Sequence, residues 1–134
     1  HLSLRRQRQM CIRDRTWGWE AADRALDLGE SRPTALVVWS DSIAVTMMQR
    51  FAQRGIRLPD EMSLVGVDNS PNCRVVWPQL TSLNHPLVEM GAKAAELLIA
   101  DAEARRRGEP AERCLPRHLY QPELVIRGTT APLP

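Results

Sequence analysis

Residues 34–70 read TALVVWSDSIAVTMMQRFAQRGIRLPDEMSLVGVDNS, and this stretch decides the fold. It opens on a short apolar run, Thr34 to Trp39, whose length and β-branched residues indicate a strand buried on both faces. A helix is expected next, because apolar residues recur at helical spacing at Ala44, Met47, Met48 and Phe51. Ser63 to Val67 is a second buried strand, followed by a turn cluster at 68–71. The stretch therefore predicts a strand–helix–strand unit of a parallel sheet.

The flanking sequence continues this alternation of helices and strands. A helix is expected over 16–29, an extended segment over 78–83, a long helix from Pro86 to about Gly108, and a last strand within 120–127. This order predicts an α/β fold with an open, mostly parallel sheet and helices on both faces, which makes three layers.

Composition places the chain among globular proteins of one-domain size. Of its 134 residues, 43% are hydrophobic and 25% are charged. No apolar run approaches the roughly 20 residues that span a bilayer, so we expect a cytoplasmic protein without a membrane partner. Cys11, Cys73 and Cys114 form no CxxC pair, which predicts reduced thiols rather than disulfides or a zinc site.

A basic arm at residues 5–15 suggests nucleic-acid binding, but we interpret it differently. The segment resembles a one-frame translation of a transposase adapter used in sequencing libraries, so we treat 1–15 as non-native and 16–134 as the domain. The arm holds five arginines and one aspartate, and the rest of the chain has 13 basic and 15 acidic residues. That mildly acidic body gives no electrostatic argument for DNA binding by this segment.

Polar groups stand at the ends of the two central strands. Trp39, Ser40 and Asp41 follow the first strand, and Asp68 and Asn69 follow the second. Ligands of open α/β sheets bind outside the carboxyl ends of the strands, where a carboxylate can accept hydrogen bonds from hydroxyl or N–H groups. An indole can offer an apolar face to a sugar or a base. These five residues are the predicted ligand site.

Structural explanations compete with that interpretation at three of the positions. Asp41 is also well placed as a helix N-cap, Asp68 as a turn residue and Trp39 as a core residue. The run Arg105 to Arg107 has two interpretations. It is consistent with a nucleic-acid contact, but it is also typical of a solvent-exposed helix C-terminus, where positive charges complement the helix dipole.

Four segments resemble the LacI/GalR family of bacterial transcription regulators. Residues 32–44 (RPTALVVWSDSIA) resemble its Pro-Thr-Ala strand followed by Asn/Ser-Asp. Residues 55–69 (GIRLPDEMSLVGVDN) resemble its Gly-x-x-x-Pro-x-Asp-x-Ser-x-x-Gly-x-Asp signature, with Glu61 where Asp is commoner. Residues 78–82 (PQLTS) and 124–130 (LVIRGTT) resemble its Pro-x-Leu-Thr-Thr/Ser and closing Leu-Val-x-Arg elements. The four motifs occur in the family's order.

This resemblance implies a periplasmic-binding-protein-like fold of type I, of which the chain is an incomplete C-terminal lobe. It implies that Asp68 holds a small-molecule effector, and that Ser40 stands where many members have an effector-contacting Asn. Asp41 would then cap the helix. Val45, Val76 and Trp77 fall where the family forms its homodimer interface, although core packing is an equal alternative for Val45.

The function expected from the resemblance is sensing of a sugar or related metabolite by a transcriptional repressor. Operator DNA would be bound only through a helix-turn-helix domain missing from this chain. The alternative is a periplasmic sugar-binding protein of an ABC transporter, which shares the fold. We expect no cofactor, no metal and no enzymatic activity, because no nucleophile elbow, phosphate-binding loop, metal cluster or convergent acid–base pair is found.

Overall fold

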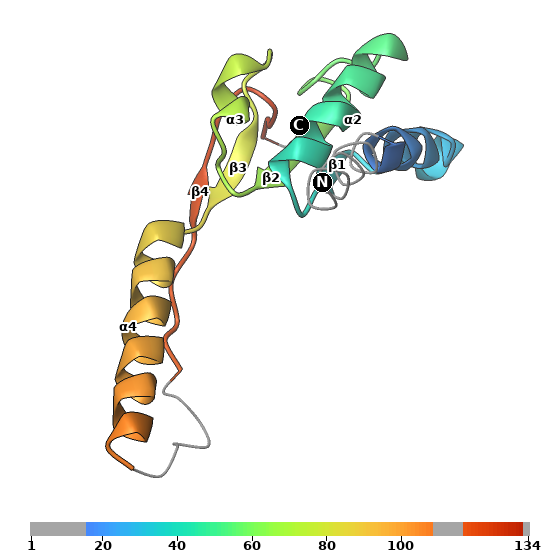
Figure 1. Ribbon diagram of the computed structural model, residues 1–134. Coiled ribbons are helices and arrows are strands. Elements are labelled where there is room, and N and C mark those ends of the chain that lie inside the picture. Colours follow the sequence, from blue (N-terminus) through green and yellow to red (C-terminus); the bar gives the residue numbers. More distant parts are fainter. Residues whose placement is uncertain (1–15, 109–116, 133–134) are drawn as a thin grey trace. The chain divides into compact units, whose positions relative to one another are not determined.

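A computed structural model describes residues 16–108 and 117–132 of the protein (Figure 1). The segment predicted to be non-native, 1–15, lies outside these residues. The described residues divide into two compact units: the first unit holds residues up to Asn84 and those from Glu123 onward, and the second unit is 85–122. Each unit is described by itself.

The first unit alternates helices and strands as predicted. A helix over 16–26 and a short 3-10 turn, η1 (Gly29–Ser31), precede the sheet. The remaining elements are β1 (Ala35–Val37), α2 (Asp41–Gln53), β2 (Ser63–Val67), α3 (Asn72–Val75), β3 (Thr81–Asn84) and β4 (Glu123–Val125). The short helix α3 stands where the sequence indicated only a loop.

The four strands form one sheet in the order β1-β2-β3-β4. The first three strands run parallel, with Leu36 opposite Leu64 and Gly66 opposite Ser82. The closing strand β4 pairs antiparallel with β3, so the sheet is mixed rather than parallel throughout. The chain leaves the first unit at the end of β3 and re-enters it at the start of β4, which reverses the direction of the returning strand.

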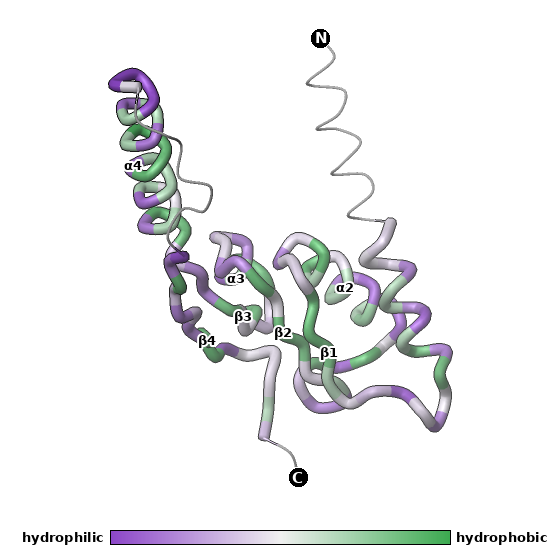
Figure 2. Tube along the Cα trace, turned by 90° about the horizontal axis from the view of Figure 1, so that it is seen from below, coloured by the Kyte–Doolittle hydropathy of each residue, from purple (hydrophilic) through white to green (hydrophobic). Residues whose placement is uncertain are grey.

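One hydrophobic cluster joins the helices of the first unit to the sheet. Met47, Met48 and Phe51 of α2 pack there against Leu64 of β2, and Ala22 joins from the first helix. Figure 2 shows α2 and α3 on the same side of the strands. Arg50 of α2 and Arg54, the residue after this helix, also bond Asp23 of the first helix, with both N–O distances 2.8 Å.

The opposite face of this sheet carries apolar side chains that no described helix of the unit covers. Val37 is 78% exposed and Leu124 is 50% exposed. Val65 and Leu83 lie between them on the same face of the sheet and are half-buried. The second helical layer expected from the sequence is therefore not among the described residues of the first unit.

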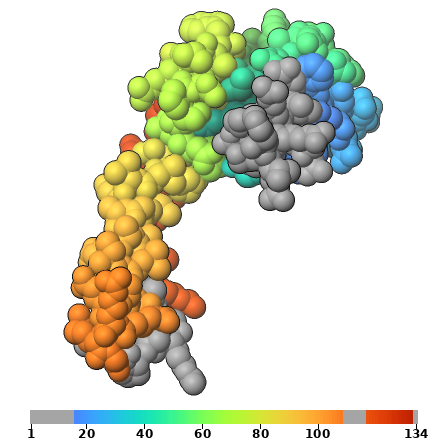
Figure 3. Space-filling view, viewed as in Figure 1, coloured from blue at the N-terminus to red at the C-terminus, as the bar shows by residue number. Residues whose placement is uncertain are grey.

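The second unit consists chiefly of the long helix α4 (Leu87–Arg106). None of the residues of this helix is buried. In the space-filling view of Figure 3, the atoms of this helix are drawn in yellow and orange. The inner face expected from the sequence is half-buried at Leu97 but exposed at its other members, which are Leu87, Met90, Gly91, Ala94 and Leu98. No helix in the described ranges is long and apolar enough to cross a bilayer.

Candidate functional site

The parallel strands bring the predicted site turns to one edge of the sheet. Trp39 and Ser40 follow β1, and Asp68 and Asn69 follow β2. Asn84, which the sequence analysis did not single out, ends β3 at the same edge. Because the carboxyl ends of parallel strands lie together, residues of different turns, at least 15 positions apart in the sequence, come to one edge of the sheet.

Asp68 is the exposed carboxylate of this edge. Its φ is 107°, a value that residues other than glycine rarely adopt. Its backbone N–H donates to the Leu83 carbonyl over 2.9 Å, but no described residue donates to its carboxylate. Backbone strain of this kind is concentrated at functional sites. The side chain is thus held at the strand end with its oxygens open to a ligand.

Asn69 adopts the left-handed conformation as well, with φ 49°, and both ends of its side chain have a protein partner. Its backbone N–H donates to Ser82 Oγ at 3.0 Å, and its Nδ2 donates to Asn84 Oδ1 at 3.3 Å. Its Oδ1 accepts a hydrogen bond from Arg127 Nη2. These three bonds make Asn69 a support of the turn.

Asp41 is buried, with 1% of its surface exposed, and links three elements. Oδ1 accepts the Ser82 hydroxyl at 2.6 Å, and Oδ2 accepts the Ser70 backbone N–H at 2.6 Å and the Cys73 thiol at 3.0 Å. The N-cap of α2 is Ser40, so the expectation that Asp41 caps the helix is wrong. Instead the carboxylate occupies the first turn of α2, where the helix dipole favours a negative charge.

Gly66 and Cys73 complete this buried network. A Cβ at Gly66 would overlap Asp41 Oδ1 and lie 3.1 Å from Leu80 Cδ2, so glycine is what admits the carboxylate beside β2. Burial first, and then the hydrogen bond and negative charge of Asp41, raise the pKa of the Cys73 thiol. Cys73 therefore stays protonated and donates to Asp41, which is the opposite of a reactive thiolate.

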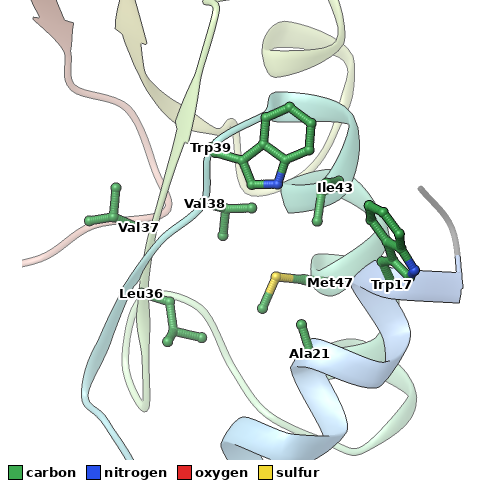
Figure 4. Close-up of a pocket in the computed structure, with 8 residues that line it drawn as sticks. All are labelled: Trp17, Ala21, Leu36, Val37, Val38, Trp39, Ile43 and Met47. Carbon is green, nitrogen blue, oxygen red and sulfur yellow. The ribbon is translucent and has the colours of Figure 1, made fainter. Parts of the chain in front are cut away.

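Trp39 is 70% exposed, so its alternative interpretation as a core residue is wrong. Its indole forms one wall of an apolar cavity of about 360 Å³ beside β1. Figure 4 shows Trp39 and Trp17 bordering this cavity, with Ile43 between them. The cavity includes neither Asp68 nor Ser40, so the predicted polar site is an open edge rather than this enclosure.

The three residues predicted for a dimer interface differ in exposure. Trp77 is 90% exposed, and Val75 beside it is 80% exposed. Val45 and Val76 are half-buried and pack against the hydrophobic cluster of the first unit. Core packing therefore accounts for much of the surface of both valines, whereas nothing in the described part of the chain covers most of Trp77.

Sequence reasoning missed Ser82, Asn84 and Arg127, which support the site turns. Their signal was weak but present: β3 reads Thr81-Ser-Leu-Asn, and polar residues at alternate positions of a central strand need buried partners. Within the described ranges no group of three His, Cys, Asp or Glu could hold a metal. The chemistry that the edge offers is hydrogen bonding through Asp68 and apolar contact through Trp39.

The chain matches the sequence profile of the periplasmic binding protein-like domain over residues 2–130 and belongs to that family. It is 36% identical over 101 residues to the arabinose metabolism transcriptional repressor of Geobacillus stearothermophilus, covering 75% of this chain and 26% of that protein. It is 33% identical over 116 residues to the HTH-type transcriptional regulator DegA of Bacillus subtilis, covering 87% and 32%. The chain thus spans a quarter to a third of these curated relatives.

Solved structures agree with the sequence relatives. The transcription regulator CcpA of Lactococcus lactis matches with a TM-score of 0.72 and 28% identity, covering 87% of this chain and 40% of that one. A regulatory protein of the LacI family from Chloroflexus aggregans matches with a TM-score of 0.67 and 33% identity, covering 85% and 39%. The predicted resemblance to LacI-type regulators and the predicted α/β fold of periplasmic binding proteins are confirmed.

Proposed function

We propose that this chain is part of the effector-sensing domain of a LacI/GalR-type transcriptional repressor. The observation that carries the proposal is the exposed Asp68 carboxylate, held at a strand end in an unusual backbone conformation without a partner among the described residues. The family assignment and the regulators among the relatives support it. A helix-turn-helix module outside this chain would bind operator DNA, consistent with relatives of which the matched stretch covers only 26% and 32%.

The effector that suits this edge is a small molecule rich in hydroxyl or ring N–H groups, such as a sugar or a related metabolite. Asp68 would accept its hydrogen bonds, Ser40 would add a hydroxyl, and Trp39 would offer an aromatic face. Relatives of similar identity include an arabinose metabolism repressor and the repressor PurR of Vibrio parahaemolyticus, so kinship alone does not select one effector.

Signalling would follow from a population shift. An effector that binds one arrangement of the whole domain more tightly stabilises that arrangement, and a homodimer would pass the change to its DNA-binding heads. Trp77, which is 90% exposed, is the residue we assign to the dimer contact. A repressor of this kind works in the cytoplasm.

The transporter alternative, a periplasmic sugar-binding protein, shares the fold and would use the same strand ends. The regulators among the relatives favour the repressor. The first experiment is to sequence the native DNA upstream of the Thr16 codon. A helix-turn-helix coding region is the expected result, and a signal peptide ahead of the lobe would overturn the proposal in favour of the transporter.

The second experiment tests Asp68 in the complete gene product. Binding of D-ribose, L-arabinose and hypoxanthine is measured by calorimetry for the wild type, Asp68→Asn and the matched control Asp60→Asn, which changes an exposed carboxylate elsewhere. A hydrogen bond to a charged group contributes about 1.5–3 kcal/mol, so Asp68→Asn should weaken binding roughly 10- to 150-fold. Equal weakening by both variants would contradict the assigned role.

A further inference from the structure

The Asn69 side chain is held at both ends, although it borders an open edge. Its carbonyl oxygen accepts from Arg127 Nη2, and its NH₂ group donates to Asn84 Oδ1 over 3.3 Å. The backbone N–H of the same residue donates to Ser82 Oγ over 3.0 Å. Three separate partners on β3 and after β4 thus fix one residue of the turn.

Arg127 is itself anchored, which makes it a rigid partner. Its Nη1 donates to the Leu80 carbonyl over 2.7 Å, and its backbone N–H donates to Thr81 Oγ1 over 2.8 Å. The guanidinium therefore joins Leu80, the residue before β3, to the Asn69 turn with two nitrogens of one planar group. A lysine has a single nitrogen at its tip and does not reproduce this fork.

The turn needs such a partner because its backbone is unfavourable. Asp68 and Asn69 have φ values of 107° and 49°, and neither is glycine. The Asp68 side chain contributes nothing to holding this shape, since no described residue bonds its carboxylate. Apart from the bond of the Asp68 N–H to the Leu83 carbonyl, the contacts of Asn69 hold the turn at the strand end.

The two bonding partners of the Asn69 side chain lie on either side of the excursion to the second unit. Asn84 is the last residue of the first unit before the chain leaves, and Arg127 follows β4, the strand by which the chain returns. The turn that carries Asp68 is therefore bonded directly to the end of β3 and to the segment after β4.

We propose that Asn69, held by Arg127 and Asn84, is a positioning residue that keeps Asp68 in its ligand-accepting conformation. The proposal rests on the proposed function of Asp68 as the effector carboxylate. It reassigns Asn69 from ligand contact, as the sequence suggested, to support of the neighbouring residue. A displacement of Asn84 at the end of β3 would then reach Asp68 through this side chain.

The test is NMR spectroscopy of the full 134-residue chain. The three-bond HN–Hα couplings of Asp68 and Asn69 report φ, and hydrogen exchange of the Asp68 amide reports opening of the turn. Arg127→Gln should shift both couplings and speed Asp68 exchange at least about tenfold, while the Val38 amide in β1–β2 pairing changes less than about twofold. The matched control is Arg74→Gln, which alters an exposed arginine of α3.

A rescue variant separates positioning from general stabilisation. Glycine adopts positive φ without cost, so Asn69→Gly should make the turn independent of Arg127. In that background Arg127→Gln should change Asp68 exchange less than about threefold. If Arg127→Gln unfolds the chain, the same comparison is made with Arg127→Lys. Unchanged Asp68 couplings and exchange in Arg127→Gln or Arg127→Lys would overturn the proposal.

Failure of the proposed function would look different. Suppose that Asp68→Asn leaves D-ribose, L-arabinose and hypoxanthine binding unaltered in the complete gene product, while Arg127→Gln still loosens the turn. This outcome would contradict the proposed effector role of Asp68. The NMR result would still support the proposal that Asn69 positions Asp68.

Discussion

Adding one methyl group at Gly66 tests the buried network around Asp41. The new Cβ in Gly66→Ala would overlap Asp41 Oδ1 and lie 3.3 Å from its Cγ. The carboxylate cannot retreat freely, because the Ser70 N–H and the Ser82 hydroxyl hold its two oxygens at 2.6 Å each. The methyl must displace a bonded carboxylate or push β2 away from α2.

The magnitude follows from these contacts. Overpacking a core costs about 1–3 kcal/mol. Giving up one hydrogen bond to the buried carboxylate costs about 1.5–3 kcal/mol more. Alanine also restricts the unfolded chain more than glycine does, which stabilises the folded protein by roughly 0.5–1 kcal/mol. We therefore expect Gly66→Ala to lower the free energy of unfolding by about 1.5–5.5 kcal/mol, a large share of the roughly 5–15 kcal/mol typical of a domain.

Urea unfolding followed by circular dichroism measures this difference. The matched control is Gly91→Ala in α4, where an added Cβ meets nothing within 4 Å and alanine is the better helix former. That control should leave stability unchanged or raise it by up to about 1 kcal/mol. A loss below about 0.5 kcal/mol for Gly66→Ala would refute the packing argument.

A double-mutant cycle identifies the clashing atom. In an Asp41→Ala background the methyl at position 66 meets only the flexible end of Leu80, 3.1 Å away, so the cost of Gly66→Ala should fall below about 1 kcal/mol. The same cost in both backgrounds would show that the carboxylate is not what the methyl meets.

Three further predictions concern other groups. Burial and the neighbouring Asp41 raise the pKa of the Cys73 thiol. At pH 8 an alkylating reagent should therefore modify Cys73 over about 100-fold more slowly in the folded chain than in urea, as measured by peptide mass spectrometry. Equal rates of modification would contradict this prediction. The hydrogen bond from Arg50 lowers the pKa of Asp23 below 3.8. The ionised carboxylate therefore contributes stability that is fully present above pH 3.8 and is lost as the pH falls through the lowered pKa. Asp23→Asn should accordingly make the free energy of unfolding less dependent on pH in this acid range. Trp77→Ser should leave the urea midpoint unchanged and reduce self-association in sedimentation velocity; a lower midpoint with equal association would count against an interface role.

Local pattern determined the elements of the first unit and their order. The run Ser63–Val67 predicts β2 with the bounds that the structure has, and the apolar stripe of 44–51 predicts α2. Such features depend on periodicity and turn residues within a few positions, so one sequence suffices. The same reasoning placed the Asp68 turn at a strand end, because a parallel sheet leaves its carboxyl ends together.

Only the tertiary structure decided what the polar residues near the site do. Asp41 looked equally like a ligand contact and a helix cap, and it is a buried acceptor for Ser82, which lies 41 positions away. Arg127 reaches Asn69 across 58 positions. Nor does local pattern set the direction of β4, which follows from where the chain leaves and re-enters the first unit. Residue spacing encodes which face a side chain occupies, whereas the partner of a polar group depends on which distant segments the folded sheet brings alongside it.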